Sequence, residues 1–295
     1  MTFNDNARLD TSKVSKRGRN TAIAGGGGAV VVVGLFILSQ LLGVDLTGLV
    51  GGGGVGGGSS SQEVALDCET GADANERTDC LVVGASNSLD DYWAEASPAV
   101  LGAAYRSPAD VNLFSQGIST GCGQASSATG PFYCPADEQI YVDPSFFEQL
   151  RTQFGASGGS LAQMYVIAHE WGHHIQKVTG VFDRTDRGGS GPASDSVRTE
   201  LQADCYAGAW AKFASTTEDA SGQALLKPFT DEQIADALNA ASVIGDDRIQ
   251  EQSSGQVDPD TWTHGSSASR QKWFTAGLDG GPQACDTFSV SASEL

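Results

Sequence analysis

Two histidines and a glutamate lie close together in the segment Val166–Lys177, in an order that suits metal chemistry. His169, Glu170 and His173 form the pattern H-E-x-x-H. On an α-helix, residues four apart lie on one face, so both imidazoles can reach one metal ion. Glu170 would then lie beside that ion, where its carboxylate can take a proton from a bound water. The chain has only four histidines, and three fall within residues 169–174, which favours a functional cluster over chance.

A second pair of residues supplies what the histidine pair lacks. A catalytic zinc ion is held by three protein ligands and keeps one position open for water. Glu200 and Asp204 are again four residues apart, which places both on one face of a second helix. We expect Glu200 to be the third ligand, because two His and one Glu form a known catalytic zinc set. We expect Asp204 to accept a hydrogen bond from the second ring nitrogen of a ligating histidine.

Three stretches of the sequence together resemble a peptidase family. They are HEWGHHIQ from His169, ELQADCYAG from Glu200, and THG from Thr263 with the following Arg270. These motifs resemble the bacterial putative neutral zinc metallopeptidases and, more widely, the gluzincin peptidases. The resemblance extends over about the whole chain. It implies an α+β, zincin-like domain, mainly helical around the zinc site with a small sheet, with Zn²⁺ as cofactor and a peptide or protein as substrate.

Hydrolysis of a peptide bond by an activated water is the chemistry that we predict. A bound zinc ion lowers the pKa of its water and polarises the scissile carbonyl. Glu170 would act as general base and pass the proton to the leaving amine. His264 is our candidate donor to the negative carbonyl oxygen of the transition state, although a lone histidine is as often structural. Tyr165, Tyr206 and Arg270 are further candidates for that role.

Two basic residues near these motifs also have structural interpretations. His174 directly follows His173 and lies about 100° further round a helix, so we do not expect it to bind the same metal. A hydrogen bond in the cleft wall suits it better. Arg270 could hold Asp204 or a loop instead of contacting substrate.

Three other functions compete with a peptidase. A structural zinc site in a binding module would use four closed ligands and would not need Glu170. An inactive peptidase-like scaffold is disfavoured by the complete H-E-x-x-H pattern with Glu200 and Asp204. A zinc hydrolase of a non-peptide bond, such as one in the cell wall, stays open, because the motif specifies a hydrolytic zinc and not a substrate.

The N-terminal region differs sharply in charge and hydropathy from the rest of the chain. Residues 1–20 carry five basic and two acidic side chains, a net +3, so the remainder must carry −22 to give the total of −19. Residues 21–44 have no charge and end in the apolar run AVVVVGLFILSQLLGV. About 20 apolar residues span a bilayer. Residues 45–61 are rich in Gly and Ser, as in a flexible linker.

These patterns predict a membrane-anchored endopeptidase with four parts. Residues 1–20 would be a basic cytoplasmic tail, by the positive-inside rule. Residues 21–44 would be an uncleaved transmembrane signal anchor, 45–61 a linker, and 62–295 an extracytoplasmic metallopeptidase domain in a single-pass cell-membrane protein. A cleaved signal peptide is the alternative, but no A-x-A-like site follows the apolar run. The acidity of the domain argues against nucleic acid as a partner, because phosphates would be repelled.

All six cysteines follow the apolar segment, and an even number outside the cytoplasm favours disulfides. Among fifteen possible pairings we favour Cys68–Cys80, Cys122–Cys134 and Cys205–Cys285. A cysteine metal site is disfavoured, because no C-x-x-C occurs.

Helices must position most of the chemical groups. We expect the metal helix to begin at Ser160 and end by Gly180, and the second helix to cover about Asp195–Phe213. Gln139–Val142 reads as a strand that lines the cleft and pairs with extended substrate, with an ordinary core strand as the equal alternative. The other expected elements are helices at about 91–105, 145–154, 231–244 and 267–276, a strand within 111–118, and loops at 62–77 and 117–130.

Overall fold

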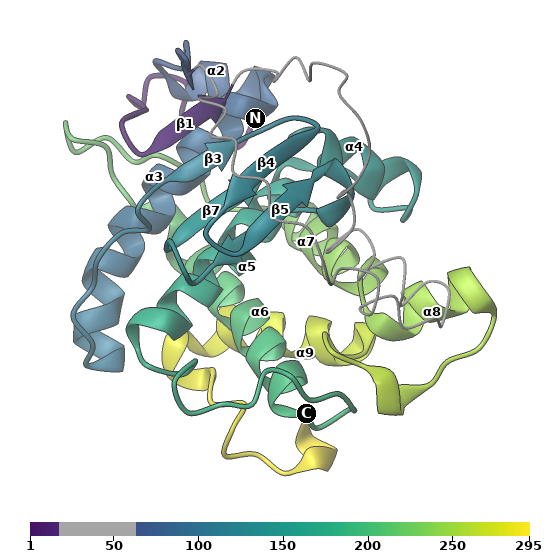
Figure 1. Ribbon diagram of the computed structural model, residues 1–295. Coiled ribbons are helices and arrows are strands. Elements are labelled where there is room, and N and C mark those ends of the chain that lie inside the picture. Colours follow the sequence, from purple (N-terminus) through teal and green to yellow (C-terminus); the bar gives the residue numbers. More distant parts are fainter. Residues whose placement is uncertain (18–62) are drawn as a thin grey trace.

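The computed structural model describes residues 1–17 and 63–295 of the chain as an α+β fold (Figure 1). Two long helices lie at its centre, α5 (Ser160–Val178) and α6 (Asp195–Phe213). A third helix, α9 (Ser267–Gly280), packs along α6. The expected mixed α+β class is confirmed, and α6 has the predicted bounds.

Glycines allow these three helices to approach closely. A Cβ atom on Gly172 of α5 would lie only 3.0 Å from the Cα atom of Ala203 on α6. Between α6 and α9 the backbones come closer still, because a Cβ atom on Gly277 would lie 1.9 Å from the carbonyl oxygen of Cys205. Such close packing fixes the helices relative to one another, so side chains that reach between them are held precisely.

Five other α-helices occur among the described residues. α3 packs against α5, and α7 packs against both α5 and α9. α7 begins at the predicted capping box, in which the Thr230 side chain accepts a hydrogen bond from the Gln233 amide. Most of α3, all of α2 and all of α8 were not predicted. Their bounds are α2 (Gly71–Glu76), α3 (Thr78–Ala96), α4 (Ser145–Thr152), α7 (Asp231–Val243) and α8 (Asp246–Ser254).

A five-stranded sheet has the order β2-β1-β3-β7-β6. β1 and β7 both run parallel to β3, whereas β2 and β6 pair antiparallel at the two edges. The strands are β1 (Val14–Arg17), β2 (Glu63–Val64), β3 (Val111–Leu113), β6 (Phe132–Cys134) and β7 (Gln139–Val142). A separate hairpin joins β4 (Gly117–Thr120) to β5 (Gly123–Ser126), where a loop was expected.

The strand predicted at Gln139–Val142 exists, but it is not the strand at the cleft edge. β7 is paired on both sides, with β3 and with β6, so its main chain has no free edge for a substrate. β6 occupies the edge instead, and Phe132 and Tyr133 of β6 line the cleft described below. The interpretation of β7 as the substrate-pairing strand is therefore wrong, the alternative of an ordinary core strand is confirmed, and β6 forms the edge of the sheet.

The N-terminal segment packs into the domain that begins at residue 63. Phe3 has no exposed surface, and its ring occupies the space beside Gly84 of α3, where a Cβ atom would lie 2.5 Å from the ring. The Asn4 amide donates to the Leu225 carbonyl at 3.0 Å. Further along, β1 lies between β2 and β3 in the main sheet. This segment is thus part of the hydrophobic core and of the sheet.

The expected division into a cytoplasmic tail, residues 1–20, and an extracytoplasmic domain, residues 62–295, stays a prediction. Residues 1–17 of that tail supply strand β1, which pairs with β2 and β3 of the main sheet. The expected membrane anchor at 21–44 and linker at 45–61 lie outside the described residues. In the described part of the chain, no helix is both long and apolar enough to cross a membrane.

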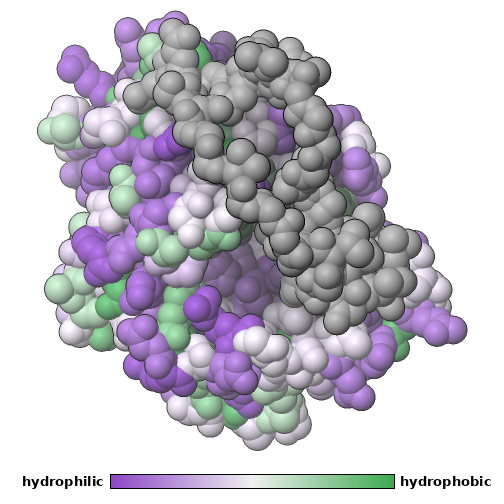
Figure 2. Space-filling view, in the orientation of Figure 1, coloured by the Kyte–Doolittle hydropathy of each residue, from purple (hydrophilic) through white to green (hydrophobic). Residues whose placement is uncertain are grey.

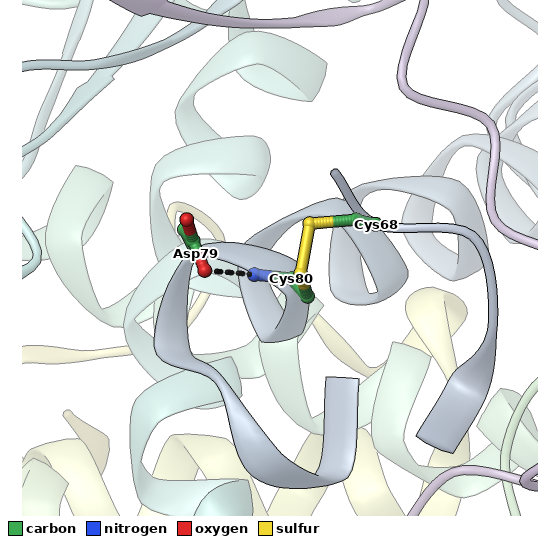
Figure 3. A group of neighbouring side chains, drawn as sticks. All are labelled: Cys68, Asp79 and Cys80. Atoms are coloured by element: carbon green, nitrogen blue, oxygen red, sulfur yellow. Dashed lines mark hydrogen bonds between the residues drawn. A yellow bond between two sulfur atoms is a disulfide. The ribbon is translucent and has the colours of Figure 1, made fainter. Parts of the chain in front are cut away.

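All three predicted disulfides are confirmed: Cys68–Cys80, Cys122–Cys134 and Cys205–Cys285. Asp79 lies beside the first of them, and its carboxylate accepts a hydrogen bond from the Cys80 amide at 3.0 Å (Figure 3). Two cysteines and an aspartate at this spacing have the residue types of a metal site. They are not one here, because both sulfur atoms are bonded to each other.

Candidate metal centre and active site

The two histidines of the H-E-x-x-H motif and Glu200 come together where α5 packs against α6. Their ligand atoms all lie within 4.8 Å of one another. The Nε2 atom of His169 lies 3.1 Å from one carboxylate oxygen of Glu200, and Nε2 of His173 lies 3.5 Å from the other. The spacing of four on α5 turns both imidazoles towards α6, which supplies the carboxylate.

This donor set fits a tetrahedral zinc ion. Zinc lies about 2.0–2.2 Å from imidazole nitrogen and carboxylate oxygen, so its tetrahedral ligand atoms stand about 3.3 Å apart. The two observed separations, 3.1 Å and 3.5 Å, each to a different oxygen of Glu200, lie close to that value. Burial disfavours a charged imidazole, but the charges of Asp204 and Glu200 outweigh it and raise the pKa of His169 to about 10. The position between these groups therefore attracts a cation.

Asp204 lies at the centre of a buried hydrogen-bond network beneath the ligands. Its Oδ1 atom lies 2.8 Å from Nδ1 of His169 and accepts from the Tyr165 hydroxyl at 2.5 Å. Arg270 donates to both Asp204 oxygens, at 2.8 Å and 3.0 Å. Burial works against the ionised carboxyl, but Arg270 and His169 outweigh it and lower the pKa of Asp204 to about 2. An ionised Asp204 accepts a hydrogen bond from the protonated Nδ1 of His169, so Nε2 is the ring nitrogen that can bind a metal.

The same network distinguishes between the alternatives for Arg270 and Tyr165. Arg270 also donates to the Tyr165 hydroxyl at 3.1 Å and to the Ile244 carbonyl at 3.2 Å. Its guanidinium is thus engaged with the protein on several sides. Of the two roles considered for Arg270, holding Asp204 is the one that these contacts match. The Tyr165 hydroxyl is likewise engaged with Asp204.

Two other candidates lie away from the metal position. His174 has no exposed surface, and burial lowers its pKa. Its Nδ1 lies 3.2 Å from the Tyr133 hydroxyl and its Nε2 lies 2.7 Å from the Arg106 carbonyl, so it joins α5 to β6. Tyr206 packs edge-on against Trp93, with ring centroids 5.2 Å apart, and does not line the cleft.

His264 faces the cleft from the loop before α9, and Asp246 at the start of α8 holds it. Nδ1 of His264 lies 3.2 Å from one Asp246 oxygen, and the other oxygen accepts from the amides of Thr263, His264 and Gly265. The His264 side chain is 42% exposed; the water that its ring loses in the cleft works against a charged ring, but the Asp246 hydrogen bond and the charge of Glu200 raise the pKa of His264. Asp246 was not predicted, because no local pattern connects it to a histidine 18 residues later.

The second ring nitrogen of His173 has a partner that the sequence analysis also missed. The Oε1 atom of Gln176 lies 2.8 Å from Nδ1 of His173. The two residues are three apart on α5, a spacing at which side chains meet. The helical spacing could therefore have indicated this contact, but glutamine is not among the usual zinc ligands.

His169, His173, Glu200 and His264 line one cleft of about 460 Å³. In the space-filling view, this face is hollowed over α5 and α6, with hydrophilic residues at the bottom (Figure 2). Glu170 lies in the cleft, and its carboxylate makes no hydrogen bond to any described side chain or amide. The cleft wall is largely apolar and includes Pro131, Phe132, Tyr133, Phe146, Phe154, Val166, Phe182, Ile244 and Ile249.

Comparison with known families agrees with this donor set. The family described as "Putative neutral zinc metallopeptidase" matches residues 3–288. The chain belongs to this family. The match begins at residue 3, so it includes the N-terminal segment that packs into the domain. A zinc peptidase family implies zinc, and the His169, His173 and Glu200 cluster is a group of described residues able to hold it.

Relatives in two bacterial groups extend this family assignment. The chain is 53% identical over 226 residues to "Uncharacterized protein Rv2575" of Mycobacterium tuberculosis strain H37Rv, which is 76% of this chain and 75% of that protein. It is 35% identical over 293 residues to "Uncharacterized protein YpfJ" of Escherichia coli K12, covering 97% of this chain and 96% of that protein. No solved structure matches significantly.

Proposed function

We propose that this member of the family is a zinc-dependent endopeptidase. One observation supports this most directly. The free carboxylate of Glu170 lies in the same cleft as a three-ligand set, with a raised-pKa histidine, His264, also lining it. Three ligands leave a fourth zinc position open, as hydrolysis requires and a closed structural site does not.

Each residue then has a distinct task. His169, His173 and Glu200 would hold the ion, which lowers the pKa of a bound water and polarises a carbonyl. Glu170 takes the proton of the attacking water and returns it to the leaving amine. His264, as imidazolium, donates to the carbonyl oxygen as negative charge develops on it.

An extended peptide suits the shape of the cleft. β6 is the edge strand of the sheet, and among the described strands none pairs with its outer side. A substrate could add to this edge through main-chain hydrogen bonds, while its side chains contact the apolar wall. The proposed substrate is therefore a peptide with bulky apolar residues near the scissile bond. A non-peptide zinc hydrolase needs no such edge.

Peptide cleavage by the full chain tests this function. The zinc-loaded protein is incubated with a broad peptide mixture and, separately, with cell-wall fragments, and new termini are mapped by mass spectrometry. We expect internal cleavage of peptides that stops on zinc chelation and returns on zinc addition. Cleavage of wall fragments alone would replace the peptidase proposal with the non-peptide alternative.

The Asp246–His264 pair predicts how turnover depends on pH. Because the pKa of His264 is raised, the ring stays protonated to higher pH than a free histidine. If turnover requires the imidazolium, kcat has its full value below this pKa and falls as the pH rises through it. Asp246→Asn removes the carboxylate charge that raises this pKa, so the alkaline decline in kcat should move to lower pH.

Profiles of kcat against pH measure this shift. The exposed Asp260 lies outside the cleft lining, so Asp260→Asn is the matched control and should leave the decline in place. His264→Ala should lower turnover far more than it lowers the zinc content of the protein. An Asp246→Asn profile that superimposes on the wild type would remove His264 from the catalytic step.

A further inference from the structure

We propose that Gln176 and Gln202 form a buried amide relay that positions His173 for metal binding and sets which of its nitrogens faces the metal. The inference rests on the zinc-dependent function proposed above. It adds two positioning residues that contact neither substrate nor metal. Gln176 has no exposed surface, and Gln202 is 6% exposed. Buried side-chain amides need a partner for each polar atom, so their contacts are informative.

The relay runs from the ligand through α5 and α6 to the C-terminal region. The Oε1 atom of Gln176 lies 2.8 Å from Nδ1 of His173. Its Nε2 atom donates to the Thr199 carbonyl at 2.7 Å and to Oε1 of Gln202 at 3.1 Å. The Nε2 atom of Gln202 in turn donates to the Cys285 carbonyl at 2.9 Å.

Two main-chain carbonyls fix the direction of every bond in this relay. A carbonyl oxygen can only accept, so the Gln202 amide must turn its NH₂ group to Cys285 and its oxygen to Gln176. For the same reason, Gln176 must turn its NH₂ group to Thr199 and its oxygen to His173. A glutamine oxygen needs a donor, so Nδ1 of His173 must carry the proton. In the neutral ring, Nε2 of His173 is then the nitrogen without a proton, and it faces Glu200, as a metal ligand must.

The two histidine ligands are therefore supported in different ways. His169 is held by the ionised carboxylate of Asp204, which fixes the tautomer and adds charge. His173 is held by a neutral amide, which fixes the tautomer and the ring orientation alone. The Cys205–Cys285 disulfide connects the two supports. Asp204, which holds His169, directly precedes Cys205, and the carbonyl of Cys285 is the last acceptor of the relay from His173.

Zinc affinity of Gln176 variants tests the relay without any substrate. Gln176→Met keeps the length of the side chain and removes its hydrogen bonds, so we expect zinc binding about 10–100-fold weaker. Gln163→Met is the matched control, on the same helix and with an oxygen that has no partner in the described structure. It should change zinc affinity less than two-fold. Dissociation constants come from competition with a fluorescent chelator, and Co²⁺ absorption reports the ligand geometry.

A conservative variant separates positioning from general stability. Gln176→Glu keeps an acceptor for His173 but removes the donor to the Thr199 carbonyl. Zinc affinity should therefore recover towards that of the wild type, although the thermal midpoint of the apoprotein falls as in Gln176→Met. If Gln176→Met fails to fold, Gln202→Met applies the same test one step further from the ligand, with a smaller loss in the same direction.

The outcomes are distinguishable from those of the proposed function. Equal zinc affinity in Gln176→Met and Gln163→Met would overturn the relay, as would a Gln176→Glu variant that binds zinc as weakly as Gln176→Met. Wild-type protein that binds zinc but cleaves no peptide would overturn the peptidase proposal and leave the relay supported by its own measurement.

Discussion

Replacing Glu170 by glutamine is expected to lower kcat for peptide hydrolysis by about 10²–10⁴-fold while zinc content stays at the wild-type value. The amide has the shape of the carboxylate but cannot take the proton of the attacking water. Glu170 is not part of the ligand set, and its carboxylate makes no hydrogen bond within the described structure, so the change leaves the site otherwise intact. Because the general base acts in the transition state, kcat and kcat/KM should fall together.

The measurement pairs peptide turnover with metal analysis of the same preparation. Glu148→Gln is the matched control, because Glu148 is exposed on α4, pairs with Arg151 and lies outside the cleft lining. It should turn over substrate like the wild type. Glu170→Gln protein with activity within a few-fold of wild type would contradict the general-base role. Loss of zinc in Glu170→Gln would instead place Glu170 among the ligands.

Local periodicity accounts for the part of the site that could be predicted from the sequence. A spacing of four on a helix brings side chains together regardless of the rest of the fold, so His169 pairs with His173, and Glu200 with Asp204, on helical geometry alone. The two pairs form one site if the two helices pack together. The residue types then indicate zinc, because two His and one Glu form a known catalytic zinc set.

The residues that support the site, Asp246 and Gln176, were not predicted from the sequence, for different physical reasons. Asp246 reaches His264 through the packing of α8 beside the loop before α9, and no sequence spacing encodes that contact. The helical spacing of three could have indicated the contact between Gln176 and His173. The role of Gln176 in positioning His173 depends, however, on its hydrogen bonds to Thr199 and Gln202 of α6. Hydrogen-bond direction in a buried network is a property of the whole set, so single residues do not reveal it.

The packing of the N-terminal segment could not be predicted, because composition does not distinguish a basic tail from a charged strand within a sheet. Lys13 and Lys16 were counted as tail charges, yet they pair with Asp90 and Asp79 of α3. The buried apolar residues of the segment are few, since Phe3, Ala7 and Val14 are the only ones among residues 1–17, so no dense apolar pattern marks it as part of a core. Their partners lie more than 60 residues away, beyond the range of any local pattern.

Removing residues 1–62, and with them the packed segment 1–17, is expected to leave the chain from residue 63 onward largely unfolded. Truncating one buried phenylalanine to alanine costs about 3–5 kcal/mol, against a total stability of about 5–15 kcal/mol for a typical domain. The deletion removes Phe3 and, in addition, the strand that joins β2 to β3. Urea unfolding of the full chain and of residues 63–295 measures the difference.

Adding the segment back as a separate peptide shows whether the loss comes from these contacts. A synthetic peptide of residues 1–17, at about 100 times its dissociation constant, should restore about 2.7 kcal/mol to the fragment 63–295. The same peptide with Phe3→Asp should restore none, because a carboxylate cannot replace the ring beside Gly84 without burying an unpaired charge. A fragment that unfolds at the same urea concentration as the full chain would instead mean that the domain folds without its N-terminal strand.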